Sequence, residues 1–268
     1  MVNVVKATGQ IEPFSEEKLR SSIKRAGIDG NIENEVVEQI KSSLYENIPT
    51  SEIYSQVKQF FGKSVHPFGG AKYSLKQAIM QLGPTGFPFE DFVAEILKAQ
   101  GYETAVREVL QGNCVNHEID VIAQKDGKKI LVEAKFHNEV GIRTDVHVPL
   151  YTKARFDDLK EKYNFNEVLI ATNTKMTSDS VAYANCVGMK ILSWSYPQEE
   201  SLRELIEKYH LHPITQLDTL TLSQKQQFLE NHIILCKDVN KTNLEILNLP
   251  PDKQSQILKE AKYIANLH

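Results

Sequence analysis

Residues 117–135 decide the fold, and they read His-Glu-Ile-Asp-Val-Ile-Ala-Gln-Lys-Asp-Gly-Lys-Lys-Ile-Leu-Val-Glu-Ala-Lys. Apolar and polar residues alternate on both sides of Asp126-Gly127, a dipeptide that strongly favours a two-residue β-hairpin turn. If these residues form the turn, Asp120 lies directly opposite Glu133, and Lys135 projects to the same side as Glu133. The apolar pairs expected on the opposite side, facing a core, are Val121 with Val132 and Ala123 with Ile130.

Two acids in this arrangement repel each other. Directly opposed strand residues have Cβ atoms roughly 4.5–5.5 Å apart, and like charges at that separation destabilise a sheet. A divalent cation held by Asp120 and Glu133 would offset the repulsion, and magnesium suits a site made of oxygen ligands and water. The alternative is an ordinary hairpin whose polar end is solvated.

Further segments on both sides of the hairpin have regular periodicity. Apolar residues at helical spacing predict a helix over residues 89–97, with Gly101 as its C-terminal cap. Downstream, the sequence predicts a buried strand at 168–173, a helix at 178–186 and a strand at 188–192.

These segments together resemble the restriction-endonuclease-like PD-(D/E)xK nucleases, and specifically their Mrr-like catalytic domain, over roughly residues 86 to 195. The matching strings are Phe89-Glu90, Gly101-Tyr102, Ile119-Asp120-Val121-Ile122-Ala123 and Val132-Glu133-Ala134-Lys135. The resemblance implies an α/β (α+β) fold with a mixed-sheet core flanked by helices. It also implies metal-assisted hydrolysis of phosphodiester bonds in DNA.

The resemblance assigns a role to each matching residue. Asp120, Glu133 and the backbone carbonyl of Ala134 would bind Mg²⁺ or Mn²⁺, Lys135 would orient or activate the attacking water, and Glu90 would complete the outer shell of the metal. Glu90 could equally be an acid favoured at a helix N-terminus. Arg155 would approach the scissile phosphate, or else it is an exposed arginine whose stem covers apolar surface.

The N-terminal region carries a second resemblance. Residues 4–14 predict two short strands about a glycine turn, and Ser15 is the expected N-cap of a helix. Together with Ile48-Pro49-Thr50-Ser51-Glu52 and Ala71-Lys72-Tyr73, this stretch is similar to the ATP-cone, a nucleotide-sensing module. The family usually has Lys-Arg-Asp-Gly where this chain has Lys6-Ala7-Thr8-Gly9, so one phosphate-binding arginine is missing.

The cone-like region is expected to bind ATP or dATP as an allosteric ligand. Lys6 and Lys18 would face the triphosphate, and Glu12 and Thr50 match positions that line the pocket in the family. No Gly-x-x-x-x-Gly-Lys-Ser/Thr loop occurs, so a motor-type ATPase is excluded. The alternative is a degenerate cone retained for interaction or dimerisation.

Pro and Gly residues indicate the domain boundaries. We expect an ATP-cone-like domain over residues 1–83, a nuclease domain over 86–197 and a helical tail over 198–268. The tail is weakly similar to helix-hairpin-helix modules, and a plain helical bundle packed on the nuclease is an equal alternative. We find no internal repeat.

Composition excludes several classes of protein. Within the 268 residues, no run of 18 apolar residues and no export signal are evident, so we expect a cytoplasmic protein without membrane contact. The three cysteines are far apart, which argues against a disulfide framework and a zinc ribbon. The net charge of −4 requires that cations for DNA be concentrated on one surface. The candidates are Lys125, Lys128, Lys129, Lys153, Arg155, Lys160 and Lys175.

The favoured hypothesis is therefore a Mg²⁺-dependent DNA endonuclease in restriction or repair, regulated by ATP or dATP. We expect it to act as a homo-oligomer, either a dimer of nuclease domains or an oligomer formed through the cone. A second hypothesis is a non-catalytic, nucleotide-responsive DNA-binding protein that uses a nuclease-like fold. A third is a regulator linked to ribonucleotide reductase that acts through cone-to-cone contacts.

Overall fold

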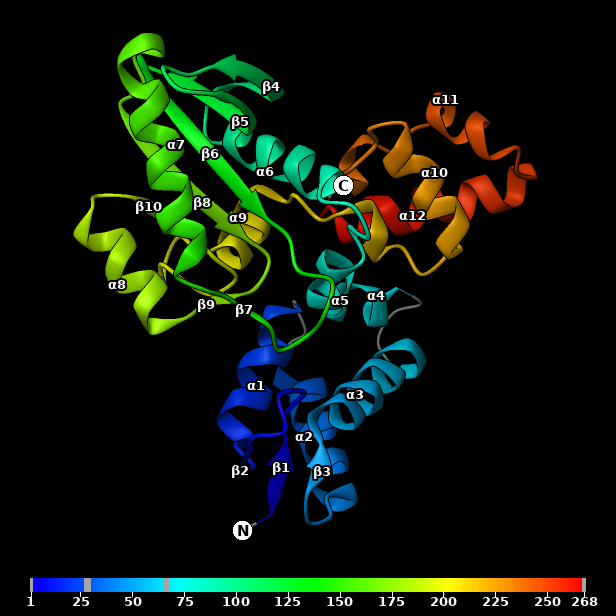
Figure 1. Cartoon of the computed structure of the whole chain (residues 1–268). Coiled ribbons are helices and arrows are strands. Elements are labelled where there is room, and N and C mark those ends of the chain that lie inside the picture. The colour runs from blue at the N-terminus through cyan, green and yellow to red at the C-terminus, as the bar shows by residue number, and fades with distance from the viewer. Residues whose placement is uncertain (1, 27–29, 65–67, 267–268) are drawn as a thin grey trace.

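A computed structural model describes residues 2–26, 30–64 and 68–266, and it divides into three parts (Figure 1). The N-terminal part contains a three-stranded sheet with the order β2-β1-β3. Its elements are β1 (Asn3–Val5), β2 (Ile11–Pro13), α1 (Glu16–Arg25), α2 (Gly30–Ser43), β3 (Ile48–Pro49) and α3 (Thr50–Ser64). The Ser15 side chain accepts a hydrogen bond from the Lys18 backbone N–H, which confirms Ser15 as the N-cap of α1.

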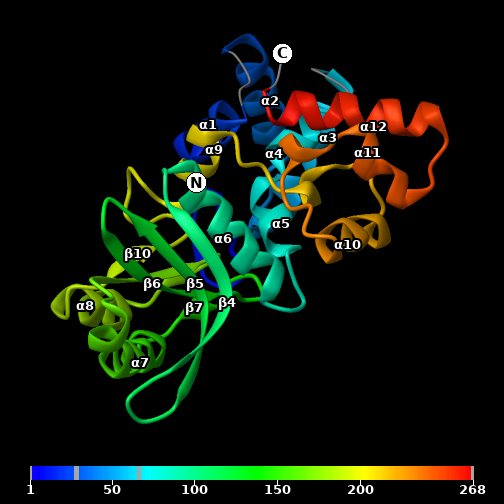
Figure 2. The same cartoon turned by 90° about the horizontal axis from the view of Figure 1, so that it is seen from above.

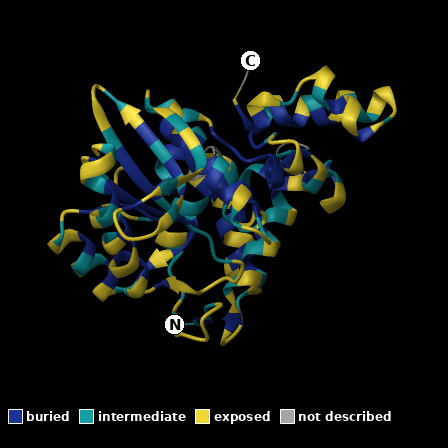
Figure 3. Cartoon of the chain, turned by 45° about the horizontal axis from the view of Figure 1, so that its top comes forward, coloured by how far each residue is buried: buried dark blue, intermediate teal, exposed yellow. Residues whose placement is uncertain are grey.

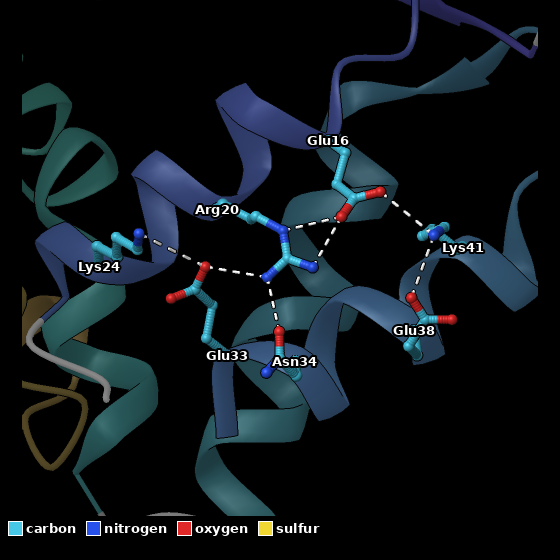
Figure 4. A network of polar contacts seen from close by, with 7 residues as sticks. All are labelled: Glu16, Arg20, Lys24, Glu33, Asn34, Glu38 and Lys41. Carbon is cyan, nitrogen blue, oxygen red and sulfur yellow. Dashed lines mark hydrogen bonds and ion pairs between the residues drawn. The ribbon is translucent and has the colours of Figure 1, made fainter. Parts of the chain in front are cut away.

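Charged side chains join α1 to α2 across the surface of this part (Figure 4). Arg20 contacts Glu16 of its own helix at 2.7 Å and Glu33 of α2 at 3.1 Å. Lys41 of α2 contacts Glu16 at 3.2 Å, so the network closes from both helices. Beneath it, the core of this part consists of apolar residues from all three helices and from β1 and β3, among them Val4, Ile23, Val37, Ile48 and Phe61.

The second part is built on a five-stranded mixed sheet with the order β10-β8-β6-β5-β4. Its strands are β4 (Glu103–Gln111), β5 (Asn116–Lys125), β6 (Lys128–Lys135), β8 (Glu167–Thr172) and β10 (Lys190–Leu192). The first three are antiparallel, whereas β6, β8 and β10 are parallel. A separate short pair joins β7 (Arg143–Thr144) to β9 (Lys175–Met176).

Helices cover both faces of this sheet (Figures 1 and 2). Helix α6 (Phe87–Ala99) packs Phe89 and Phe92 in one cluster with Val121 and Val132. On the other face, α7 (His147–Tyr163) and α8 (Ser178–Cys186) pack against Leu131. The expected mixed sheet between helices is confirmed, and Figure 3 shows the buried residues gathered along it.

The hairpin has the expected turn and register. Asp126 and Gly127 have φ angles of 50° and 75°, as a type I′ turn requires. Val121 pairs with Val132 and Ala123 with Ile130, and both pairs lie on the α6 side. Local pattern alone therefore located the core face of these two strands.

Two short helices, α4 (Gly69–Tyr73) and α5 (Leu75–Met80), connect the N-terminal part to α6. Their buried residues Ala71 and Leu75 belong to the core around α6 and not to the N-terminal core. Thr215 in the C-terminal part donates a hydrogen bond to the Ala78 carbonyl at 2.7 Å, and Gln216 donates one to the Ala71 carbonyl at 3.0 Å. The connecting helices are thus held by the C-terminal part.

The C-terminal part is helical and shares the core of α6. Its elements are α9 (Leu202–Tyr209), η1 (Ile214–Gln216), α10 (Leu222–Glu230), η2 (Cys236–Asp238), α11 (Lys241–Leu244), η3 (Glu245–Leu247) and α12 (Pro251–Ile264). Buried Leu205, Phe228 and Ile257 pack in the same cluster as Phe92. This part is therefore a helical unit packed on the nuclease-like domain and not a separate extension.

Two local units of similar build follow one another in the C-terminal part. Pro213, before η1, forms an antiparallel bridge with Leu235, before η2. Each 3₁₀ helix leads to an α-helix that begins with a capping box, at Thr221 and at Asn240. The two α-helices have nine and four residues. Because these lengths differ, the two units agree in their turns and caps but not over their whole length.

None of the helices in the described ranges has the length and apolar character that crossing a membrane requires.

Candidate active site

The sheet is interrupted at Asp120. On one side, Val106 pairs with Val121 and Glu108 with Ile119, but no pairing joins the residues between them. On the other side, the pairing of β5 with β6 ends at Val121. Instead, the Asp120 carboxylate accepts a hydrogen bond from the Ala134 backbone N–H at 2.7 Å. The side chain of Asp120 thereby satisfies a strand N–H and lies against the end of β6 that carries Glu133.

The same interruption changes which way the strand faces. Ile119 packs with Leu131 on the α7 side, whereas Val121 packs on the α6 side. A strictly alternating strand would place both residues on one side. The residue opposite Asp120 on β4 is Arg107, whose φ of 56° lies in the left-handed region. The strict period of two therefore fails on both strands at this point.

Glu133 forms an ion pair with Arg155 of α7, and both side chains are largely buried. Arg155 is therefore neither an exposed arginine nor a solvated charge, and that alternative is wrong. Its Nη1 donates to Glu133, while its Nε is buried without a hydrogen-bond partner in the described part of the chain. Sequence reasoning named this residue but not its partner, because the contact depends on how α7 packs on the sheet.

The pKa shifts of Asp120 and Glu133 are those expected of two acids that lie close together in a partly buried site. Burial, followed by the charge of Asp120, raises the pKa of Glu133 to about 7, against the opposing influence of Arg155 and Lys135. Burial also raises the pKa of Asp120, although the Ala134 N–H and Arg155 oppose this. Both carboxylates are thus destabilised in their charged form, a condition that a bound cation would relieve.

Glu90 lies at the start of α6 and is buried. Burial, and then the charge of Asp120, raise its pKa to about 7. Arg107 contacts Glu90 at 3.2 Å and the neighbouring Asp91 at 2.7 Å. The charge of Asp120 therefore acts on Glu90, and Glu90 is at the same time in an ion pair with Arg107. Sequence reasoning missed Arg107, although extending the antiparallel register from β5 to β4 places it opposite Asp120.

The donor set fits a hard divalent cation. In residues 2–26, 30–64 and 68–266, no group of three or more His, Cys, Asp or Glu side chains is arranged to hold a metal ion. A site of two carboxylates, the Ala134 carbonyl and several waters needs no third side chain, and Mg²⁺ commonly keeps such water ligands. Lys135 is the last residue of β6, and it is close enough to lower the pKa of both acids. Full coordination would require Arg155 to release an oxygen of Glu133.

Most of the cations expected to bind DNA already have partners. Lys125 donates to the Gln100 carbonyl at 2.6 Å, and Lys160 lies 3.5 Å from Asp157. The others with charged or aromatic partners are Lys128 with Glu167, Lys153 with Asp157, and Lys129 with the rings of Tyr163 and Phe165. A single basic surface around the hairpin is therefore not formed by these residues alone.

His117 has a structural partner. Its Nε2 lies 2.8 Å from Asp158 of α7, which also accepts a hydrogen bond from the Cys114 backbone N–H at 2.9 Å. The contact with His117 is the main cause that lowers the pKa of Asp158 to about 2. The pair holds the β4–β5 loop on α7, so His117 is a structural residue and not an exposed group at the entrance of the strand.

The residues expected to bind a nucleotide also come together. Glu12, Lys18 and Thr50 line a pocket of about 200 Å³ in the N-terminal part. Glu12 contacts Lys6 at 2.5 Å and Lys18 at 3.0 Å, and these contacts lower its pKa. One carboxylate thus engages both lysines that were expected to face a triphosphate, and Lys6 itself lines a different pocket.

Comparison with known proteins identifies three family models along the chain. The ATP cone domain matches residues 2–68, a restriction endonuclease model of the Mrr type matches residues 84–195, and the model described as AF1548-like, C-terminal, matches residues 212–265. The last of these was not foreseen from the sequence, where the tail only resembled helix-hairpin-helix modules.

Individual relatives agree with these models. An uncharacterized protein of Archaeoglobus fulgidus is 37% identical over 175 residues, which are 64% of this chain and 99% of that protein. The crystal structure of AF1548, titled a protein of unknown function, has a TM-score of 0.60 at 34% identity and covers 68% of this chain and 99% of that one.

Two solved nucleases are more distant. A repair endonuclease from Pyrococcus abyssi has a TM-score of 0.30 at 20% identity, with 37% of this chain and 42% of that one covered. The DNA modification-dependent restriction endonuclease AspBHI has a TM-score of 0.37 at 11% identity, with 59% and 38% covered. Both scores are too low to carry an argument. The A. fulgidus protein, matched over nearly its whole length, decides the assignment: this chain belongs to the AF1548-like family and joins a restriction-endonuclease-like domain to an ATP cone domain.

Proposed function

We propose that this protein is a metal-dependent endonuclease that hydrolyses phosphodiester bonds in DNA. The observation that carries the proposal is the convergence of two partly buried acids, Asp120 and Glu133, with Lys135 at one interruption of the sheet. Two acids this close together are unfavourable unless they bind a cation. A domain that binds no metal would have no reason to keep both of them. The restriction-endonuclease-like family match supports the same chemistry.

Each residue has a separate task in the proposed reaction. Asp120, Glu133 and the Ala134 carbonyl would hold Mg²⁺ or Mn²⁺, which when bound lowers the pKa of water and polarises a phosphoryl oxygen. Lys135 would orient the attacking water and stabilise the negative charge that develops on the phosphate. Glu90 would act through water on the outer side of the site.

Arg155 would exchange partners during this cycle. Without metal, its guanidinium neutralises Glu133. Once a cation has taken its place at Glu133, the Arg155 guanidinium would be released and could turn towards a phosphate oxygen of bound DNA. The arginine would thus occupy Glu133 at rest and contact substrate in the loaded site.

The cone domain would make the activity responsive to nucleotide. We propose ATP or dATP as the allosteric ligand, with Lys6, Glu12, Lys18 and Thr50 as the residues nearest to it. The ATP cone match and the pocket in this domain support the proposal. Action in restriction or repair, a cytoplasmic location and a homodimer belong to the same proposal.

One observation favours a second function. The ion pair with Arg155 occupies Glu133, which is also what a protein that binds DNA without cleaving it would show. The third idea, a regulator of ribonucleotide reductase, has no specific support in the geometry.

Cleavage of supercoiled plasmid distinguishes the two functions. The wild type should nick the plasmid with Mg²⁺ or Mn²⁺ and not with EDTA, and Glu133→Gln should lower the rate by about a hundredfold or more. Glu118→Gln changes an exposed acid on the same strand as Asp120 and serves as the matched control. Equal rates in wild type and Glu133→Gln would remove the catalytic assignment. DNA retention in a mobility-shift assay, without nicking in either metal, would favour the binding protein.

A further inference from the structure

A second pocket lies where the N-terminal part meets the nuclease-like domain. It has a volume of about 220 Å³ and takes its walls from both domains and from the connecting helix α5. The residues that matter here are Lys6 and Thr8 of the β1–β2 turn, Lys76 of α5, Arg143 and Lys175 of the β7–β9 pair, and Trp194. We call it the boundary pocket.

The two domains touch at this pocket. Gly141 has a φ of +93°, and a Cβ atom added there would lie 3.0 Å from the Thr8 methyl group. Gly141 belongs to the loop that leads from the end of β6, at Lys135, through β7 to α7, which carries Arg155. Figure 1 shows this loop reaching from β6 towards the N-terminal hairpin. A change at the turn can therefore reach both elements of the candidate active site through one loop.

The charges in the boundary pocket are not balanced. Arg143 and Lys175 are direct partners in the parallel pairing of β7 with β9, yet neither forms an ion pair within the described ranges. Lys76 donates to the Asn173 carbonyl at 2.5 Å and lies 4.3 Å from the Trp194 ring centroid, and no carboxylate of the described residues pairs with it. Three cations thus converge in a protein whose net charge is −4.

Of these three cations, Lys76 loses the most contact with water. Burial, and secondly the charge of Lys175, lower its pKa to about 8, so it still carries a proton at neutral pH. A cation in contact with a carbonyl and a ring face is only partly compensated. An anion in the pocket would offset the repulsion between Lys76 and Lys175 and would give Lys76 a partner of opposite charge.

The pocket inside the cone has the opposite character. There, Glu12 already neutralises Lys6 and Lys18, and Ala7 occupies the position where the cone family has its arginine. The positive charge available to a phosphate is therefore greater at the boundary pocket than in the cone pocket.

We propose that the boundary pocket binds the phosphate groups of a small nucleotide, with Arg143, Lys175 and Lys76 as their donors and Trp194 as the wall beneath. A pocket of about 220 Å³ between two domains, open to solvent on the side of Arg143 and Lys175, suits a short polyphosphate and not a duplex. Since its cations come from the nuclease-like domain and α5 while Thr8 closes it from the cone, bound phosphate favours the docked arrangement. This proposal does not depend on whether the protein cleaves DNA.

Calorimetric titration of the full chain with ATP and with pyrophosphate, in the absence of DNA, tests the proposal. Arg143→Ala and Lys175→Ala should each weaken binding of both probes about tenfold or more, because each substitution removes a charge-assisted hydrogen bond to a phosphate oxygen. Lys259→Ala, an exposed lysine of α12, is the control and should bind like the wild type. Lys18→Ala, in the cone pocket, should keep its affinity for pyrophosphate.

Three results would overturn the proposal: no binding of either probe by the wild type at millimolar concentration, loss of binding only in Lys18→Ala, or loss of affinity for a short DNA duplex but not for ATP in the Arg143 and Lys175 variants. Hydrogen exchange provides an independent measurement. ATP should slow amide exchange in residues 6–10 and 140–143 of the wild type but not in a variant that combines Arg143→Ala with Lys175→Ala. Unchanged exchange in both segments of ATP-bound wild type would contradict the bridging role.

Discussion

Replacing Arg155 by methionine removes the positive partner of Glu133 while keeping a long apolar stem. Breaking a buried ion pair by removing one partner commonly costs about 3–5 kcal/mol, because the other charge stays buried. Here the loss of stability is smaller, because Glu133 has a raised pKa of about 7 and can become neutral by taking up a proton. We therefore expect Arg155→Met to lower the free energy of unfolding by about 2 kcal/mol at pH 7 without divalent metal.

The dependence on metal makes this prediction specific. If Arg155 competes with a cation for Glu133, Mg²⁺ or Mn²⁺ should restore more stability to Arg155→Met than to the wild type. For a domain of this size, a loss of about 2 kcal/mol corresponds to a decrease of about 5 °C in the melting temperature. Differential scanning calorimetry in EDTA and in 10⁻² M Mg²⁺, on the order of saturating concentration for such sites, measures both values.

Controls separate the ion pair from the loss of packing. Lys162→Met removes an exposed cation from the same helix and should change neither the stability nor the effect of metal. In Glu133→Gln, the further substitution Arg155→Met should cost much less than in the wild type, because no buried charge is left behind. A metal effect equal in wild type and Arg155→Met, or an unchanged melting temperature in EDTA, would refute the reasoning.

Two other predictions concern the C-terminal part. Burial lowers the pKa of His212 to about 4, so its neutral form is favoured in the folded state, and this residue should take about 3 kcal/mol from stability as the pH falls from about 6.5 to 4. Its imidazole should stay neutral at pH 5.5 by NMR; a titration near 6.5 would contradict this. Buried Glu260 accepts hydrogen bonds at 2.9 Å from the backbone N–H groups of Asp218 and Thr219. Glu260→Ala should lower the free energy of unfolding by about 3 kcal/mol in denaturant titrations, and Glu260→Gln by less, because the amide oxygen still accepts one of these hydrogen bonds; equal losses would contradict this contribution of the remaining acceptor.

Local sequence pattern was sufficient for the hairpin. A single dipeptide with φ angles that favour Asp and Gly fixed the register, and the register then placed Asp120 next to Glu133. The helix at Ser178–Cys186 and the cap at Ser15 were predicted for the same reason, because their signals lie within a few residues.

Contacts between distant elements could not be predicted in this way. The pairing of Arg155 with Glu133 depends on the packing of α7, and the pairing of Arg107 with Glu90 depends on a left-handed residue in β4. The boundary pocket requires the N-terminal turn to meet a loop that lies more than a hundred residues further along the chain. None of these contacts has a signal in a local window of sequence.

The most direct test of the proposed active site is anomalous diffraction from crystals of the full chain soaked in Mn²⁺. We predict a peak bounded by the carboxylates of Asp120 and Glu133 and the Ala134 carbonyl, with the Arg155 guanidinium displaced from Glu133. The account would be contradicted by two findings together at a Mn²⁺ concentration sufficient for cleavage. These are the absence of a peak at this position and an intact ion pair between Arg155 and Glu133.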